Sequence, residues 1–183
     1  MTCIVGIVTP ERKVVLGGDS AGSNGFGIHT RRDPKVFKNG EFVIGYTTSF
    51  RMGQLLRFSF AQPDVKEGID PYEYMVKAVV PAIMRVFKDG GFERKQTSGQ
   101  LEGGDFLIGW RGGLYRIEED FQVAVEGHDF AAVGSGMYVA EGALYATREH
   151  PGITPMERLR IALEAAVEFN AGVRGPFTYV ETD

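Results

Sequence analysis

The stretch that decides the fold lies at the start of the chain. It reads Thr2-Cys3-Ile4-Val5-Gly6-Ile7-Val8-Thr9-Pro10-Glu11-Arg12-Lys13-Val14-Val15-Leu16-Gly17-Gly18-Asp19-Ser20. Two runs rich in β-branched residues, 3–8 and 13–19, are typical of strands, and a short turn over residues 10–12 separates them. The pattern therefore predicts a hairpin whose first strand begins almost at residue 2, although chain ends usually fray unless other contacts hold them.

More strands follow this hairpin. The composition of residues 20–27, with three glycines and an asparagine, is typical of a loop. A short strand is predicted over 35–38, and a buried strand returns over 41–47. Between them Asn39-Gly40 is a strong signal for a two-residue hairpin.

Helical patterns appear twice, each time as a pair. After Ser49 an apolar stripe indicates the first helix; the stripe consists of Met52, Leu55, Leu56 and Phe60. Residues 70–73 form a capping box with proline at the first helical position, and Pro81 predicts a kink in the helix that follows. The second pair is predicted from Gly136 to about residue 149, and from a second capping box at residues 154–157. The polar stretch 93–104 is predicted to be a mobile loop.

Further strands are predicted at 105–110, 114–118, 122–125, 131–133 and 177–180. Strands and helices thus come in groups rather than alternating, which favours antiparallel sheets with helices layered outside them. We therefore predict an α+β fold, a four-layer αββα sandwich of two antiparallel sheets, formed by one domain over residues 1–183.

Composition narrows the classes of partner. The net charge is −4 and no long basic run occurs, which argues against binding to nucleic acid or to an anionic membrane. Cys3 is the only cysteine, so an internal disulfide is excluded, and the chain suits a reducing cytoplasm. No apolar run approaches the length of a membrane span.

Four short motifs resemble, in order and spacing, those of a known family. They are Thr2-Cys3-Ile4-Val5-Gly6-Ile7, the strand end Gly18-Asp19-Ser20, Lys35-Val36-Phe37, and Ala132-Val133-Gly134-Ser135-Gly136. The family is that of proteasome β-subunits and the bacterial ATP-dependent relatives of their peptidase ring, which are N-terminal-nucleophile hydrolases. The resemblance covers nearly the whole chain and is clearest over its first third and over 131–166.

The resemblance implies a catalytic set. Thr2 would be the nucleophile after removal of Met1, with its own α-amino group as base. Lys35 would supply positive charge beside Thr2, and Asp19 would orient Lys35. Ser135 would hydrogen-bond around the amine, as it does in the family.

The same resemblance places an oxyanion donor and reveals two departures. The backbone N–H of Thr48 would stabilise the oxyanion. However, Thr47-Thr48-Ser49 stands where the family carries a glycine pair, and a threonine has less backbone freedom there. Near the C-terminus the family's Asp-x-x-Ser-Gly is missing, and residues 168–175, including Asn170, stand there instead.

Each residue also has a plainer interpretation. Taken alone, Asp19 is a turn residue, Lys35 an edge-strand lysine and Ser135 a helix N-cap. Cys3 should point into the core, because neighbouring residues of a strand face opposite sides. The three histidines lack metal-site spacing and are expected at the surface, so no metal or cofactor is implied; they are His29, His128 and His150.

Three functions compete on the sequence. The leading hypothesis is a threonine peptidase in a homo-oligomeric ring that acts on peptides or unfolded proteins and allows for an ATPase partner. The apolar stripe after Ser49 and the apolar helix after Asp70 predict self-association. The rivals are a catalytically silent relative that keeps the fold for assembly, and a nucleotide-binding module built on Gly134-Ser135-Gly136.

Overall fold

Two antiparallel sheets face each other in the computed structural model, which describes residues 1–24, 26–92, 94–95 and 101–183. The first sheet has the order β12-β1-β2-β13 and the second has the order β11-β10-β9-β6-β5. The strands of the first are Phe130–Val133, Ile4–Val8, Val14–Gly18 and Thr178–Glu181; those of the second are Val123–Val125, Gly113–Ile117, Phe106–Trp110, Phe42–Tyr46 and Val36–Asn39.

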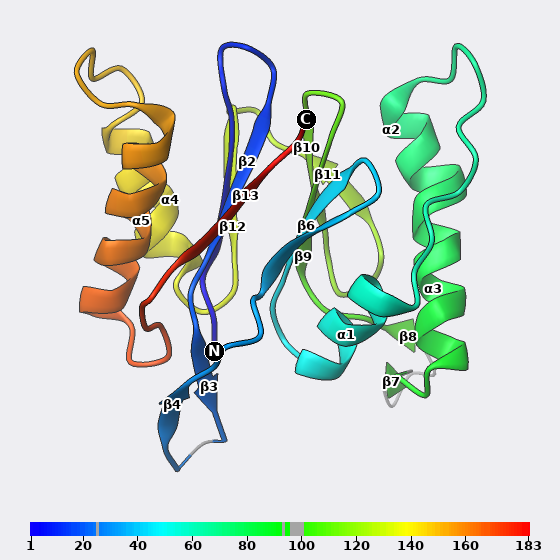
Figure 1. The fold of residues 1–183 in the computed structure, drawn as a ribbon, viewed down its shortest axis with the longest axis horizontal. Coiled ribbons are helices and arrows are strands. Elements are labelled where there is room, and N and C mark those ends of the chain that lie inside the picture. The colour runs from blue at the N-terminus through cyan, green and yellow to red at the C-terminus, as the bar shows by residue number, and fades with distance from the viewer. Residues whose placement is uncertain (25, 93, 96–100) are drawn as a thin grey trace.

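Helices cover the outer face of each sheet. Helices α4 (Met137–Ala146) and α5 (Pro155–Phe169) pack on the first sheet. Helix α1 (Phe50–Phe58) and the continuous run of α2 (Pro71–Tyr74), η1 (Met75–Val79) and α3 (Val80–Asp89) pack on the second. Figure 1 shows the four layers edge-on, so the predicted αββα sandwich is confirmed.

The alternation of strand β1 explains the layering. Ile4 faces the apolar cluster between the sheets, whereas Val5 and Ile7 face the cluster beneath α4 and α5. Cys3 belongs to the helix-side cluster and is 0% exposed, as predicted. Because both faces of β1 are buried, this strand is held from two sides along its length.

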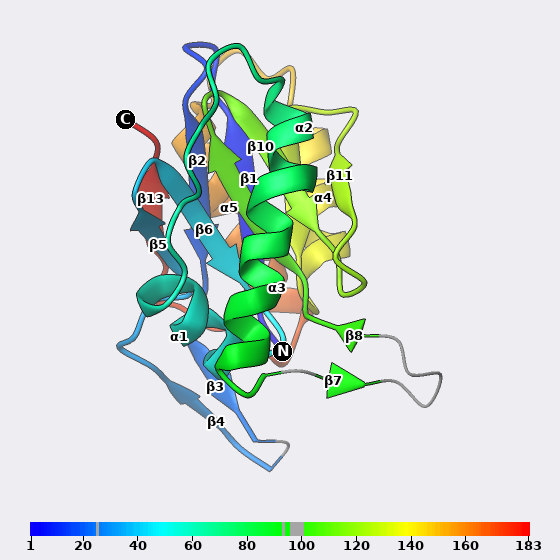
Figure 2. The same ribbon diagram turned by 90° about the vertical axis from the view of Figure 1, so that its right-hand side faces the viewer.

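The prediction of a loop over residues 20–27 is wrong in part. Strand β3 (Ala21–Ser23) pairs with β4 (Ile28–Thr30) in a hairpin that projects from the sandwich at the end where the N-terminus lies (Figures 1 and 2). The turn residues of the prediction lie near the tip of this hairpin, where Asn24 Oδ1 accepts a hydrogen bond from the N–H of Gly27. The strands themselves are only three residues long, too short to give a periodic pattern.

Several helix predictions need adjustment. The helix of α2 and α3 contains the π-turn η1 just before Pro81, where a kink was predicted. A proline cannot donate the usual bond, and a wider turn is one way for a helix to absorb that loss. The capping box at Thr154 and Glu157 is present, whereas α4 ends at Ala146, earlier than predicted.

Within the predicted loop 93–104, β7 (Arg94–Lys95) pairs with β8 (Leu101–Glu102). Residues 93 and 96–100 lie outside the described part of the chain, so the prediction of mobility remains a prediction there.

The apolar stripe over α1 and the residues just after it does not support self-association. Its members are at most 4% exposed and pack into the cluster beneath the second sheet; they are Met52, Leu55, Leu56 and Phe60. The stripe fills this chain's own core, because α1 spans a face that the long α2–α3 helix does not cover alone. Among the described residues, no helix combines the length and apolar character needed to cross a bilayer.

Candidate active site

Thr2 stands two residues before the start of β1 and is 5% exposed. Its backbone N–H donates to Ser135 Oγ at 3.2 Å, and its carbonyl accepts from the N–H of Gly136 at 3.2 Å. The loop before α4 thereby holds the start of the chain in a defined position. These contacts explain how a strand can begin so close to the N-terminus without fraying.

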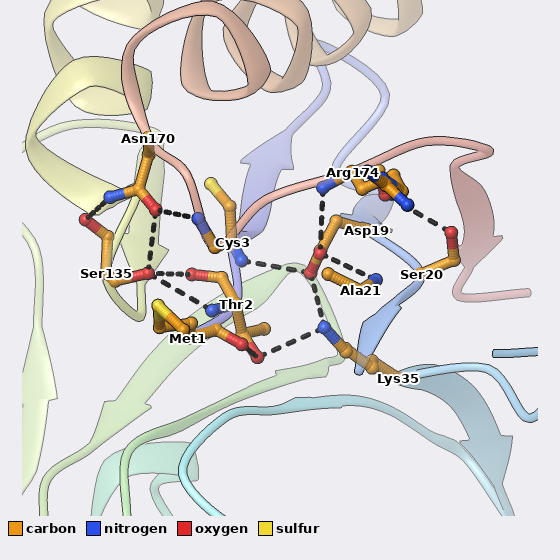
Figure 3. Close-up of polar contacts among 11 residues, drawn as sticks. Met1, Thr2, Cys3, Asp19, Ser20, Ala21, Lys35, Ser135, Asn170 and Arg174 are labelled. Atoms are coloured by element: carbon orange, nitrogen blue, oxygen red, sulfur yellow. Dashed lines mark hydrogen bonds and ion pairs between the residues drawn. The ribbon is translucent and has the colours of Figure 1, made fainter. Parts of the chain in front are cut away.

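Lys35 lies directly before β5 and connects Thr2 with Asp19. Its Nζ is 3.1 Å from Thr2 Oγ1 and 2.7 Å from Asp19 Oδ1 (Figure 3). Both residues, Lys35 and Asp19, are 2% exposed. The spacing of the three residues in the sequence thus corresponds to a convergence in space, and Lys35 is not the solvated edge-strand lysine of the plainer interpretation.

Asp19 is fixed by the backbone around it. Its two carboxylate oxygens accept from the N–H groups of Cys3, Ala21 and Arg174 at 3.1, 2.9 and 3.3 Å. Three backbone donors fix the direction of this buried carboxylate. Asp19 therefore does more than end a turn: it forms a buried ion pair with Lys35.

Burial shapes the electrostatics of the site. Desolvation lowers the pKa of Lys35 below its ordinary value, and contact with Asp19 opposes that shift. Burial also raises the pKa of the Cys3 thiol to about 12, with the charge of Asp19 adding to the effect. At neutral pH Cys3 is therefore a protonated thiol in the core.

Ser135 is not the N-cap of α4, because Gly136 occupies that position and makes no side-chain cap bond. The Ser135 hydroxyl instead faces Thr2 and lies 3.2 Å from Asn170 Oδ1, while Asn170 Nδ2 donates to Ser135 O at 2.7 Å (Figure 3). Sequence reasoning left Asn170 without a role. The signal that could have found it is its position, just after α5 and two residues before Gly172, in the segment where the family carries an aspartate.

Thr48 lies at the end of β6, beside Thr2, with a left-handed backbone whose φ is 62°. A β-branched residue rarely adopts this conformation. The Thr48 hydroxyl lies 3.1 Å from that of Thr47, and a Cβ added at Gly104 would come within 2.8 Å of Thr48 Cβ. Thr48 is exposed but contacts Thr47 and lies close to Gly104; its role as oxyanion donor stays a prediction.

Two cavities open beside Thr2, of about 90 and about 320 Å³. Two larger cavities, of about 390 Å³ each, contain none of the predicted site residues and share Arg12 of the β1–β2 turn.

Among the described residues, no cluster of three or more His, Cys, Asp or Glu side chains is arranged to hold a metal. All three histidines are exposed.

Comparison with known proteins yields the fold. No protein-family model matches the chain, and no curated protein is similar to it. Solved structures do match over nearly the whole of this chain. BPH of Thiobacillus denitrificans is 21% identical, with a TM-score of 0.82 over 100% of this chain and 98% of that one. Its complex with epoxomicin is 22% identical, with a TM-score of 0.80 over 98% of each chain. HslV of Trypanosoma brucei is 19% identical, with a TM-score of 0.70 over 98% of each chain.

The chain has the fold of the proteasome-like N-terminal-nucleophile hydrolases.

In this proteasome-like fold the predicted residues gather at one end of the sandwich. Lys35 and Asp19 stand on one flank of Thr2, and Ser135 with Asn170 on the other (Figure 3). The arrangement can hold a hydroxyl against a cation while a separate group contacts the Thr2 nitrogen.

Proposed function

We propose that this chain is a threonine-type peptidase subunit of a homo-oligomeric proteasome-like ring, with residues 1–183 acting as one unit. The observation that carries the proposal is the buried contact of Lys35 Nζ with both Thr2 Oγ1 and Asp19 Oδ1. A cation beside the hydroxyl stabilises the alkoxide that attacks a carbonyl, and a fixed carboxylate keeps that cation in place.

The proposed reaction uses the α-amino group of Thr2 as base. The amine takes the Oγ proton while Oγ bonds to the substrate carbonyl carbon, and the Thr48 N–H donates to the oxyanion. The amine then gives its proton to the leaving nitrogen as the C–N bond breaks, leaving an ester on Thr2. Water attacks this ester with the amine as base, the acid product leaves, and Thr2 Oγ regains a proton.

Removal of Met1 is a condition of this mechanism. With Met1 attached, the Thr2 nitrogen is an amide that donates to Ser135 Oγ, and an amide cannot act as the base. The Met1 carbonyl also accepts from Thr2 Oγ1, which engages the nucleophile. Thr2 has a small side chain, the kind that permits methionine removal.

The ring, its substrates and its partner belong to the proposal as well. Likeness to the HslV fold supports subunits that assemble side by side, with peptides or unfolded proteins as substrates and an ATPase that feeds them. Large apolar side chains remain exposed on three helices, which supports contacts between copies; they are Phe58, Tyr138 and Phe169. We place the assembly in the cytoplasm.

A silent assembly protein is the second candidate. Thr48 in a left-handed conformation and Asn170 in place of an aspartate both favour it. A nucleotide-binding module is disfavoured, because the Gly136 N–H already donates to Thr2 O and β12 is antiparallel to β1.

A covalent trap separates the two remaining candidates. Intact-mass spectrometry first establishes whether Thr2 is the N-terminus. The processed protein is then treated with a panel of peptide epoxyketones, the class of reagent that includes epoxomicin, with small and large side chains at the reacting residue. A peptidase should gain one adduct per chain, and Thr2→Ala should gain none. Processed protein that stays unmodified by the whole panel would leave assembly as its function.

A further inference from the structure

The two cavities beside Thr2 share one wall. Each is lined by Thr2, Thr47 and Thr48, together with Met1, which the proposed function removes. Beyond that wall the linings differ. The cavity of about 90 Å³ continues to Ser23, Lys35, Tyr46, Ser49 and Phe50. The cavity of about 320 Å³ continues to Asp105, Gly134, Ser135 and Met137.

The wall of the smaller cavity is held rigidly. Tyr46 is 4% exposed, and its ring packs so closely on Gly53 that an added Cβ there would lie 2.1 Å from it. Phe50 contacts Tyr46 edge-on at 6.2 Å between ring centroids, and the Arg31 guanidinium stacks 3.7 Å above its ring. This aromatic wall therefore cannot move back by a simple rotation of the Tyr46 or Phe50 side chain.

Thr47 is fixed as well, whereas Thr48 is exposed and contacts its neighbours. Thr47 Oγ1 donates to Asp105 O at 2.8 Å, and Thr48 packs against Gly104. The left-handed backbone at Thr48 is the conformation that glycine adopts most easily, yet a branched side chain occupies it.

The proposed reaction indicates which cavity takes the acyl side of the cleaved bond and which takes the leaving side. The amine of Thr2 must pass its proton to the leaving nitrogen, so the leaving group lies on the flank of Thr2 N. That nitrogen faces Ser135, which lines the larger cavity. The side chain of the residue whose carbonyl is attacked then lies on the opposite flank, with Lys35, in the smaller cavity.

We infer that Thr48 and Phe50 restrict the residue on the acyl side of the cleaved bond to a small aliphatic or hydroxyl side chain. This inference rests on the proposed function and names its substrate class. In the chain with Met1 attached, this cavity measures about 90 Å³ and Met1 is one of its walls. The walls that stay when Met1 is removed include Tyr46, Thr48 and Phe50, which suit alanine, serine or threonine better than leucine or phenylalanine. The leaving side accepts larger residues.

The test uses processed protein, with Thr2 as N-terminus, and fluorogenic peptide amides that differ only at the acyl-side residue. The wild type should turn over the alanine substrate with a kcat/KM about ten-fold or more above that of the leucine substrate. Thr48→Gly and Phe50→Ala should each reduce this ratio by about ten-fold. Met137→Ala, which alters only the larger cavity, should leave the ratio unchanged. Thr48→Gly should fold, because glycine suits the left-handed backbone.

The possible results separate a failure of this inference from a failure of the proposed function. Wild-type protein that prefers leucine or phenylalanine, or variants that keep the wild-type ratio, would overturn the inference while leaving the peptidase function standing. Absence of turnover with every substrate, together with absence of an epoxyketone adduct, would overturn the proposed function and this inference with it.

Discussion

The two flanks of Thr2 are built in different ways. On one flank Lys35 and Asp19 are charged, 2% exposed and tied to several backbone donors. On the other, Ser135 is exposed and bonded to Asn170, and both side chains are neutral. A buried ion pair depends on both its partners, whereas a neutral and accessible pair tolerates change. The proposed chemistry should therefore be far more sensitive on the Lys35 flank.

The largest effect should come from Lys35→Met. It removes the cation beside Thr2 and leaves the Asp19 carboxylate buried without a counter-charge, which costs about 3–5 kcal/mol of unfolding free energy. We expect turnover to fall by about 10³-fold. Denaturant unfolding and peptide turnover measure the two effects. In the control Asp19→Asn/Lys35→Met, stability should recover while turnover stays low. A stable and active Lys35→Met protein would contradict the account.

The pH dependence should reflect both flanks. Below the pKa of the Thr2 amine, about 7.7–8.0 for a free α-amino group, the base is protonated, so turnover should rise with pH through this range. Because burial lowers the pKa of Lys35, its charge is lost at a lower pH than for a free lysine, and turnover should fall again on the alkaline side. A pH profile of kcat/KM that is flat from pH 6 to 9 would count against the amine as base.

A smaller effect is expected at Asn170. Asn170→Ala removes the donor to Ser135 O and the acceptor for the Ser135 hydroxyl and the Gly172 N–H. Because the group is neutral and partly exposed, unfolding should become easier by about 1 kcal/mol and turnover should fall by about ten-fold. If Asn170→Ala matched Lys35→Met in its loss of turnover, the two flanks would be equivalent and our comparison would fail.

The smallest effect is expected at Cys3, which faces the core. Its pKa of about 12 keeps the thiol protonated at pH 8, so iodoacetamide should leave the native protein unlabelled and label it after denaturation. Cys3→Ala should keep wild-type turnover within about two-fold. Rapid labelling of the native protein, followed by mass spectrometry, would show that the thiol is accessible.

The sequence predicted the αββα layering because strands and helices are grouped and their apolar faces are periodic. It also predicted the contact between Thr2, Asp19 and Lys35 through motif spacing. It could not predict what depends on tertiary contact. The short strands β3 and β4 carry no periodic signal, and the α1 stripe cannot by itself reveal whether it faces its own core. The pairing of Ser135 with Asn170 joins segments 35 residues apart, which local patterns do not record.

The central claim is that Thr2 is the nucleophile, and turnover by processed protein tests it most directly. Wild type, Thr2→Ala and Cys3→Ala are each confirmed to begin at residue 2 by intact mass and then compared on an alanine-ended fluorogenic peptide amide. We predict cleavage by wild type and Cys3→Ala, and none above background by Thr2→Ala with assembly intact. Equal cleavage by Thr2→Ala, or no cleavage by processed wild type, would contradict the claim.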